Sequence, residues 1–129
     1  MPATVDTNVL VYDTFSDTSL HREARDRLDS LDRWVIPAMT LHEYVWFMRA
    51  EGVDLDFLKM KAREYLGHEK ATLVSITVDD LLFALEAMED YADYNDLLIL
   101  SVSKRLNVPL LTYDRSLKRK AQQHGVKTL

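Results

Sequence analysis

Short apolar runs alternate along this chain with longer segments whose apolar residues recur at helical spacing, and this alternation restricts the possible folds most strongly. Four runs have the length of strands: one ending at Val5, and residues 33–38, 71–77 and 108–114. Strands separated by helices pair in parallel through right-handed crossovers, and helices then cover both faces of the sheet. We therefore expect an α/β protein with three layers, α/β/α, around a central, mostly parallel sheet of four to five short strands.

Helices are expected between these strands, because apolar residues there lie three and four positions apart. Polar N-cap residues and glycines after the last turn indicate their bounds. The expected helices are a first turn after Val5 and helices near residues 20–31, 40–52, 55–67, 79–90, 94–106 and 116–123. The last residues, 126–129, can add a fifth strand at an edge of the sheet. The 129 residues fit one domain, 1–129, which is long enough to bury a core without disulfides.

Composition excludes several kinds of site. Cysteine is absent, so disulfides and thiolate metal sites are excluded. No run is apolar for long enough to span a membrane, and the N-terminus lacks the features of a signal peptide, so we expect a cytoplasmic protein without a membrane partner. Sixteen Lys and Arg against 21 Asp and Glu give a net charge of −5, which is not the basic surface of a typical nucleic-acid-binding protein. An acidic enzyme can still act on a phosphate polymer when a metal ion bridges the two.

Four acidic residues are predicted to lie at the edge of the sheet where its strands end. Asp6 and Asp114 each end a strand, and Glu43 lies in the first turn of the helix after the second strand. Asp96 lies in the first turn of the helix before the fourth strand. That helix must run antiparallel to the strand that follows it, so its first turn also reaches this edge. Ligands of open α/β sheets bind there.

Neighbouring carboxylates repel one another, and a divalent cation removes this conflict. Mg²⁺ prefers oxygen ligands and binds between one or two carboxylates and a substrate phosphate. Such an ion polarises a phosphodiester, lowers the pKa of an attacking water and neutralises the leaving oxygen. Spacing alone predicts an anion or metal site, and the chemistry of the four acids favours a metal-dependent nuclease.

Each of the four carboxylates also has a purely structural interpretation. Thr40 and Glu43 fit a capping box, and Asp96 can occupy the same third position in its own helix. Asp114 can cap the last helix, and residues 6–8 can form a turn. The sequence leaves both interpretations open at this point.

Four stretches of the chain resemble the PIN-domain family, and together they span most of its length. They are VDTNVLV at 5–11, LHEYVW at 41–46, DYNDLLILSVSKRLNVPLLTYD at 93–114 and HGVKTL at 124–129. Within that family the chain looks most like the compact VapC-type toxins of bacterial and archaeal toxin–antitoxin pairs. The resemblance implies a Mg²⁺- or Mn²⁺-dependent endoribonuclease that hydrolyses RNA phosphodiester bonds. It also implies a homodimer and an antitoxin, whose C-terminal segment binds across a groove and directs a basic side chain toward the acidic site.

The resemblance also implies roles for individual residues. The catalytic and metal-binding residues of the family match Asp6, Glu43, Asp96 and Asp114. Its small polar residues beside the acids, which orient a ligand or a water, match Thr7, Asn8 and Thr112. Asp93 competes with Asp96 for the ligand role, and we favour Asp96 because it directly precedes the apolar run 97–99, as the acid of the family does. Asn95 departs from the small residue that the family often has there.

Two further groups of residues have both a functional and a structural interpretation. Basic residues follow Asp114 and either contact RNA phosphates or form a solvated helix face; they are Arg115, Lys118, Arg119 and Lys120. Apolar residues around 44–60 exceed what one helix face can bury. We expect Val45 and Leu58 in the core, and Trp46 and Phe57 in a groove for a partner helix or in a dimer surface.

Two other functions compete with a toxin ribonuclease. The first is a PIN-fold module that processes or binds RNA without toxin activity. The second is a phosphatase or phospho-acceptor domain on a similar sheet. A phosphatase of the haloacid dehalogenase type needs a second Asp two residues after the first, and position 8 is Asn8. The paired early acids of a receiver domain are also missing, so the second alternative is disfavoured.

Overall fold

Four parallel strands form the central sheet of the computed structural model, which describes residues 1–129. The strands are β1 (Pro2–Val5), β2 (Arg33–Pro37), β3 (Ala71–Val74) and β4 (Leu110–Leu111), in the order β3-β2-β1-β4. The predicted parallel sheet is therefore confirmed. The fifth strand is not formed, because β4 is only two residues long and offers the C-terminus a single isolated bridge between Leu110 and Thr128.

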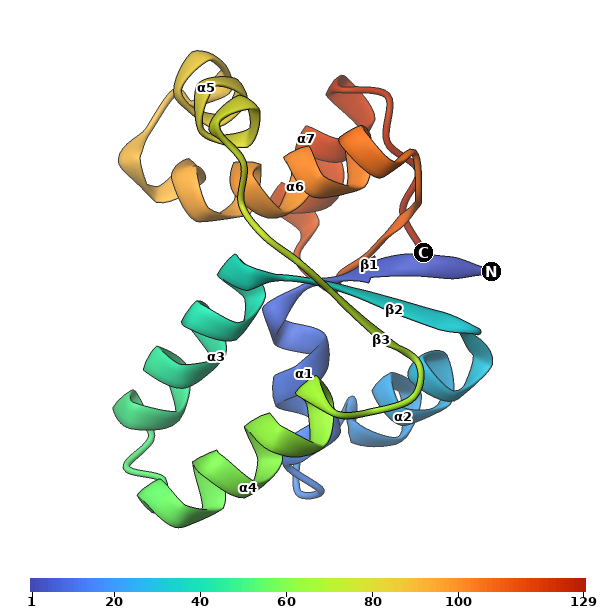
Figure 1. Ribbon diagram of the computed structural model, residues 1–129, viewed down its shortest axis with the longest axis vertical. Helices are drawn as coiled ribbons and strands as arrows, with labels where there is room; N and C mark the ends of the chain where they lie inside the picture. Colours follow the sequence, from blue (N-terminus) through green and yellow to red (C-terminus); the bar gives the residue numbers. More distant parts are fainter.

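Helices cover both faces of this sheet, which confirms the predicted α/β/α layers (Figure 1). One layer contains α1 (Thr7–Thr14), α2 (His21–Ser30), α3 (Ala38–Ala50) and α4 (Leu55–Leu66). The other contains α5 (Val78–Ala87), the short 3₁₀ helix η1 (Tyr91–Asp93), α6 (Tyr94–Leu106) and α7 (Arg115–Gln123). No helix is both long enough and apolar enough to cross a bilayer.

Helices α3 and α5 begin earlier than the sequence indicates. Helix α3 starts directly after β2, and Thr40 does not cap it: its hydroxyl donates instead to the carbonyl of Val5 at 2.9 Å. The capping-box interpretation of Glu43 is therefore wrong. Helix α5 begins after Thr77, which forms a capping box with Asp80 and ends the strand region sooner than expected.

The core has two parts, one on each side of the sheet. A larger cluster lies under the sheet around Trp34 and Tyr44, and a smaller one lies above it around the apolar face of α6. Tyr44 is fully buried, whereas its neighbour Val45 is 39% exposed, so the expectation that Val45 lies in the core is wrong. Adjacent helical residues point about 100° apart, and Tyr44 occupies the inward position, where its hydroxyl bonds Thr14 at 2.8 Å.

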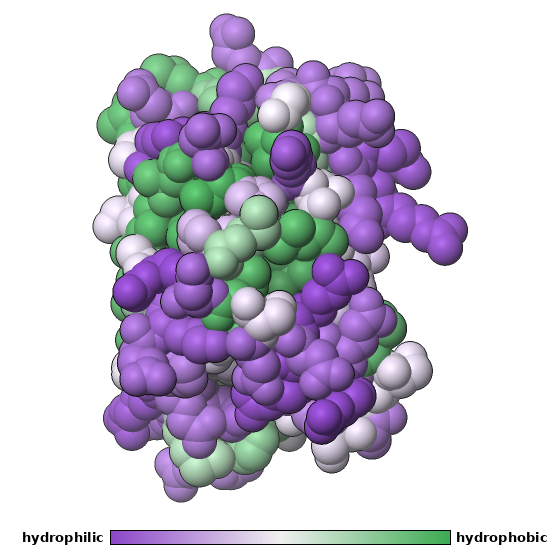
Figure 2. Space-filling view, turned by 90° about the vertical axis from the view of Figure 1, so that its right-hand side faces the viewer, coloured by the Kyte–Doolittle hydropathy of each residue, from purple (hydrophilic) through white to green (hydrophobic).

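Several large apolar side chains remain exposed at the surface. They include Trp46 on α3, Phe57 on α4, Leu73 on β3, and Leu82 and Leu85 on α5. Figure 2 shows another face, on which apolar residues gather at the height of the sheet between hydrophilic regions above and below. Contiguous exposed apolar surface commonly marks a region that another chain covers.

Candidate active site

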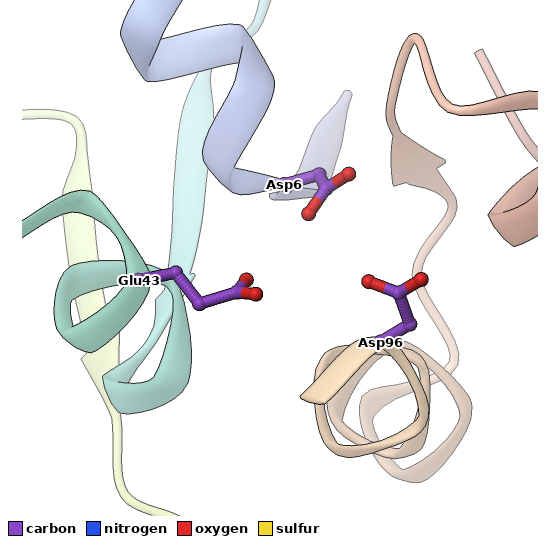
Figure 3. A group of neighbouring side chains, drawn as sticks. All are labelled: Asp6, Glu43 and Asp96. Carbon is purple, nitrogen blue, oxygen red and sulfur yellow. The ribbon is translucent and has the colours of Figure 1, made fainter. Parts of the chain in front are cut away.

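Three carboxylates converge at the edge where the strands end. Asp6, Glu43 and Asp96 each offer an oxygen atom, and these atoms all lie within 4.8 Å of one another. Figure 3 shows the three side chains pointing toward a common space from three elements: the β1–α1 junction, α3 and α6. The parallel topology brings together residues that are far apart in the sequence, as the strand-end prediction requires.

Asp6 is held by hydrogen bonds on both of its oxygens. Its Oδ1 caps α1 by accepting from the backbone N–H of Thr7 at 2.8 Å, and its Oδ2 accepts from the hydroxyl of Thr112 at 2.6 Å. The same Thr112 hydroxyl accepts from the backbone N–H of Asp114 at 3.0 Å. Asp6 is only 4% exposed, so this network fixes a buried carboxylate at the end of β1.

Glu43 is held from the opposite side by α1. The hydroxyl of Thr7 donates to its Oε1 at 2.7 Å. The next residue, Asn8, accepts from the backbone N–H of Tyr113 at 3.3 Å and so joins the start of α1 to the end of β4. Thr7 and Thr112 therefore contact carboxylates of the cluster, whereas Asn8 bonds only the backbone.

Burial and mutual repulsion raise the pKa values of two of these carboxyls. Burial raises the pKa of Asp6 to about 6, although its hydrogen bonds from Thr112 and Thr7 oppose the shift. The pKa of Asp96 rises to about 7, first through burial and then through the charges of Asp6, Asp114 and Glu43. A cation between them would relieve both effects. The set of hard oxygen donors therefore fits a divalent ion such as Mg²⁺ or Mn²⁺.

Asp114 lies near this cluster and also caps α7. Its Oδ1 caps α7 by accepting from the backbone N–H groups of Ser116 at 2.8 Å and Leu117 at 3.2 Å. The structural interpretation of Asp114 is thus correct. Its charge also raises the pKa values of Asp6 and Asp96, which places it beside them. It is not one of the three residues whose oxygens lie within 4.8 Å of one another.

Asp93 is held away from the cluster. Its Oδ2 accepts from the backbone N–H groups of Glu89 at 3.1 Å and Asp90 at 3.2 Å, and its Oδ1 forms an ion pair with Lys120 at 3.2 Å. It does not cap α6 through its side chain. Asp96, and not Asp93, therefore belongs to the group of converging carboxylates.

The carboxylates line a cleft of about 590 Å³ that continues over apolar side chains. Its acidic residues are Asp6, Asp17, Glu43, Glu51, Asp96 and Asp114, and its apolar ones are Val11, Tyr12, Phe15, Phe47 and Val53. No Lys or Arg lines it. Val11 and Phe15 were not predicted to line a cleft, although they follow Thr7 at intervals of four residues and so share its side of α1.

The basic residues of α7 lie outside this cleft. Arg115 and Arg119 are exposed and Lys118 is half-buried. The ammonium group of Lys120 is already engaged within the protein, because it pairs with Asp93 and donates to the Ser116 hydroxyl at 2.7 Å. Three cations therefore remain available to a ligand that reaches α7.

Several solved structures share this fold. VapC20 of Mycobacterium tuberculosis, a toxin that cleaves the sarcin–ricin loop, superposes with a TM-score of 0.78 at 14% identity over 92% of this chain and 94% of that one. VapBC2 of Rickettsia felis, bound to a DNA fragment from its promoter, matches with a TM-score of 0.71 at 17% identity over 100% and 98%. A toxin–antitoxin complex of Klebsiella pneumoniae matches with a TM-score of 0.67 at 20% identity over 90% and 89%.

Sequence comparison identifies the family. No curated protein matches this sequence. The family model described as "PIN domain" matches residues 3–123, which is nearly the whole chain and includes all four of the acids predicted from the sequence. With the parallel α/β/α fold and the converging carboxylates, this match shows that the chain belongs to the PIN-domain family.

Proposed function

We propose that the protein is a divalent-metal-dependent endoribonuclease and the toxin of a VapBC-type toxin–antitoxin pair. The observation that carries this proposal is the convergence of Asp6, Glu43 and Asp96, with oxygens within 4.8 Å of one another and two pKa values raised toward neutrality. The likeness of the fold to VapC20 and VapBC2 supports the toxin assignment.

In this proposal Asp6, Glu43 and Asp96 hold a Mg²⁺ or Mn²⁺ ion, and Asp114 completes the acidic set. The bound ion supplies a Lewis acid for the phosphodiester and lowers the pKa of the attacking water. The protein's own contribution is to hold its ligands still. The hydroxyl of Thr112 fixes an oxygen of Asp6, and the hydroxyl of Thr7 fixes an oxygen of Glu43. Hydrogen bonds to the ligands orient them in the same way in other metal sites.

RNA binding is assigned to α7. The site itself carries a dense negative charge, so it repels RNA phosphates wherever no cation intervenes. Arg115, Lys118 and Arg119 follow directly after Asp114 and offer the positive charge that phosphates next to the cleaved bond require. We propose that they position the RNA backbone without reading its sequence.

The antitoxin is proposed to bind in the cleft. Six acidic residues and five apolar residues line it, and no basic residue does. A segment with both basic and apolar side chains complements that surface. Toxin–antitoxin complexes with this fold, such as the one from Klebsiella pneumoniae, support a protein partner of this kind.

A homodimer is proposed through the exposed apolar side chains of α3 and α5, which include Trp46, Leu82 and Leu85. Self-association would remove these side chains from water. Light scattering of the purified chain tests this point: the wild type is expected to have the mass of a dimer and Leu82→Lys/Leu85→Lys that of a monomer. As an enzyme of cellular RNA, the protein is proposed to act in the cytoplasm.

The deciding experiment is RNA cleavage by purified protein freed of any partner. Total RNA and end-labelled tRNA are incubated in Mg²⁺, in Mn²⁺ and in EDTA with the wild type, Asp96→Asn and the control Asp56→Asn. Asp56 is an exposed acid in the first turn of α4, so its loss changes the net charge equally without touching the site. Metal-dependent cleavage by the wild type and the control, but not by Asp96→Asn, is expected.

Other outcomes separate the alternatives. Metal binding without cleavage of either RNA would favour a different nucleic-acid substrate. Neither metal binding nor cleavage would favour an RNA-processing or RNA-binding module of the same fold. Cleavage that persists in Asp96→Asn would contradict the assigned site.

A further inference from the structure

A small polar cluster links two segments that carry acids of the site. Lys120, on α7, forms an ion pair with Asp93 at 3.2 Å between Nζ and Oδ1, and donates to the hydroxyl of Ser116 at 2.7 Å. Asp93 ends η1, directly before α6, and Ser116 lies in the first turn of α7. The ammonium group of Lys120 therefore bridges the starts of two helices.

Both partners of Lys120 are themselves fixed to backbone near the site. The second oxygen of Asp93 accepts from the N–H groups of Glu89 and Asp90, which closes the turn leading into α6. The backbone N–H of Ser116 donates to Asp114 at 2.8 Å. One side of the bridge thus holds the turn that precedes Asp96, and the other holds the residue that caps α7.

The ion pair between Lys120 and Asp93 is better shielded from water than a surface ion pair such as that of Arg22 and Asp26. The Lys120 and Asp93 side chains are 18% and 19% exposed, whereas those of Arg22 and Asp26 are 85% and 59% exposed. Exposed pairs contribute little because water and salt screen them, while breaking a shielded pair leaves a charge without its partner. The positive charge of Lys120 also acts on Asp96, lowering its pKa against the effect of the neighbouring acids.

We propose that Lys120 is a positioning residue of the carboxylate site: through Asp93 and Ser116 it fixes Asp96 and Asp114 relative to each other. Its role is distinct from the phosphate contacts assigned to the other α7 cations, because its ammonium group is already engaged within the protein. The consequence for activity rests on the proposed nuclease function, but the consequences for metal binding and backbone protection do not require RNA cleavage.

The expected loss of metal affinity can be estimated from other metal sites, in which side chains that orient the ligands have been removed. Losing a side chain that orients metal ligands typically weakens metal affinity or activity about 10- to 100-fold. Lys120 acts on the position of two helix starts rather than on one ligand directly. We therefore expect the lower end of that range, about 10-fold, for its neutral variant.

The test compares Lys120→Gln with Lys120→Arg and with the control Lys61→Gln. Arginine keeps the charge and can still pair with Asp93. Lys61, on α4, also forms an ion pair, at 2.9 Å to Glu64, and its side chain is as little exposed as that of Lys120, at 20%, whereas Glu64 is 55% exposed. Calorimetric titration of the full chain with Mn²⁺ measures affinity, and amide hydrogen exchange measures protection of the two backbone segments.

The proposal predicts a distinct pattern across the three variants. In Lys120→Gln, Mn²⁺ affinity falls about 10-fold, and amide exchange speeds up at both Glu89–Asp90 and Ser116–Leu117. Lys120→Arg recovers most of the affinity and protection, and Lys61→Gln changes neither. With RNA, Lys120→Gln lowers kcat more than it raises KM, because a misplaced site affects the reaction more than backbone binding.

A double-mutant cycle separates the bridge from a general loss of stability. Asp93→Asn keeps an oxygen for the turn amides but removes the charge, so adding Lys120→Gln to it should cause little further loss of Mn²⁺ affinity. Additive losses would overturn the proposal, as would unchanged exchange in Lys120→Gln. A wild type that neither binds Mn²⁺ nor cleaves RNA would contradict the proposed function, and the exchange pattern would still decide whether Lys120 couples the two segments.

Discussion

The hydroxyl of Thr7 donates a 2.7 Å hydrogen bond to Oε1 of Glu43, joining α1 to α3 across 36 positions of sequence. The backbone N–H of the same Thr7 donates to Oδ1 of Asp6. One residue therefore orients two of the three converging carboxylates. A hydrogen bond to an ionised carboxylate is stronger than one between neutral groups, so this contact holds the Glu43 side chain in place.

The first prediction concerns this hydroxyl. Thr7→Val keeps the shape of the side chain and the backbone N–H, but removes the donor to Glu43. We expect RNA cleavage and Mn²⁺ affinity to fall about 10-fold. The melting temperature should fall much less, because Glu43 can bond water in the cleft. Thr72→Val, which changes an exposed threonine of β3, serves as control, and equal activity of Thr7→Val and wild type would contradict the orienting role.

The second prediction concerns pH and the stability of the metal-free protein. The pKa of Asp96 is raised to about 7 in the folded protein, above its ordinary value of 3.8. A raised pKa means that folding favours the protonated form, so its stabilising effect is complete below pH 3.8 and is lost as the pH rises through 7. Urea unfolding in EDTA should therefore show Asp96→Asn gaining stability relative to the wild type between pH 5 and pH 8.

Added metal should reverse this difference. Mn²⁺ at pH 8 stabilises the wild type through its differential binding to the folded state, whereas Asp96→Asn lacks one ligand and gains less. A constant difference between wild type and variant across this pH range would contradict the raised pKa of Asp96, and an equal effect of Mn²⁺ on both proteins would contradict its role as a ligand.

The position of the site was predictable from the sequence because it depends on topology. Apolar runs separated by helices imply parallel strands, and parallel strands place Asp6 and Asp114 at one edge. The contacts between helices were not predictable in the same way. Lys120 and Asp93 lie far apart in the sequence, and their pairing depends on how α7 packs beside η1, for which no local pattern exists. The predicted fifth strand is not formed, because its partner β4 has only two residues with which to pair.

A sequence pattern is ambiguous where an aspartate at the start of a helix can either cap that helix or pair with a cation on another one. Asp80 lies in the first turn of α5, where the sequence pattern indicates only a helix boundary, yet it is 1% exposed. It accepts from Ser101 at 2.7 Å and pairs with Arg105 at 3.0 Å, so it also ties α5 to α6. An N-cap pattern predicts a helix boundary but does not reveal whether the carboxylate then faces a cation on another helix.

The third prediction tests this structural carboxylate. Asp80→Ala leaves the Ser101 hydroxyl without its partner and breaks the ion pair with Arg105, whose side chain is 32% exposed, so we expect a loss of about 2 kcal/mol of unfolding free energy. Urea unfolding measures the loss. Because Asp80 is not part of the carboxylate cluster, Mn²⁺ affinity of the folded protein should stay within about twofold. A large loss of affinity with no loss of stability would indicate that α5 acts on the site directly.

The fourth prediction concerns RNA binding by α7. Arg115 and Arg119 are exposed on this helix, whose first turn is capped by Asp114 of the site. Replacing both with Glu should weaken binding of RNA similarly for different sequences, because phosphate contacts carry no base information. Each lost phosphate contact lowers the slope of log affinity against log salt by roughly 0.7 for single-stranded nucleic acid, so the double variant should lower it by roughly 1.4. Titrations of RNA with the catalytically impaired Asp96→Asn protein measure this salt dependence without cleavage.

The control is Arg22→Glu/Arg27→Glu on α2, which makes the same change of charge elsewhere. An equal loss of RNA affinity in that control would show a general effect of charge rather than contacts from α7.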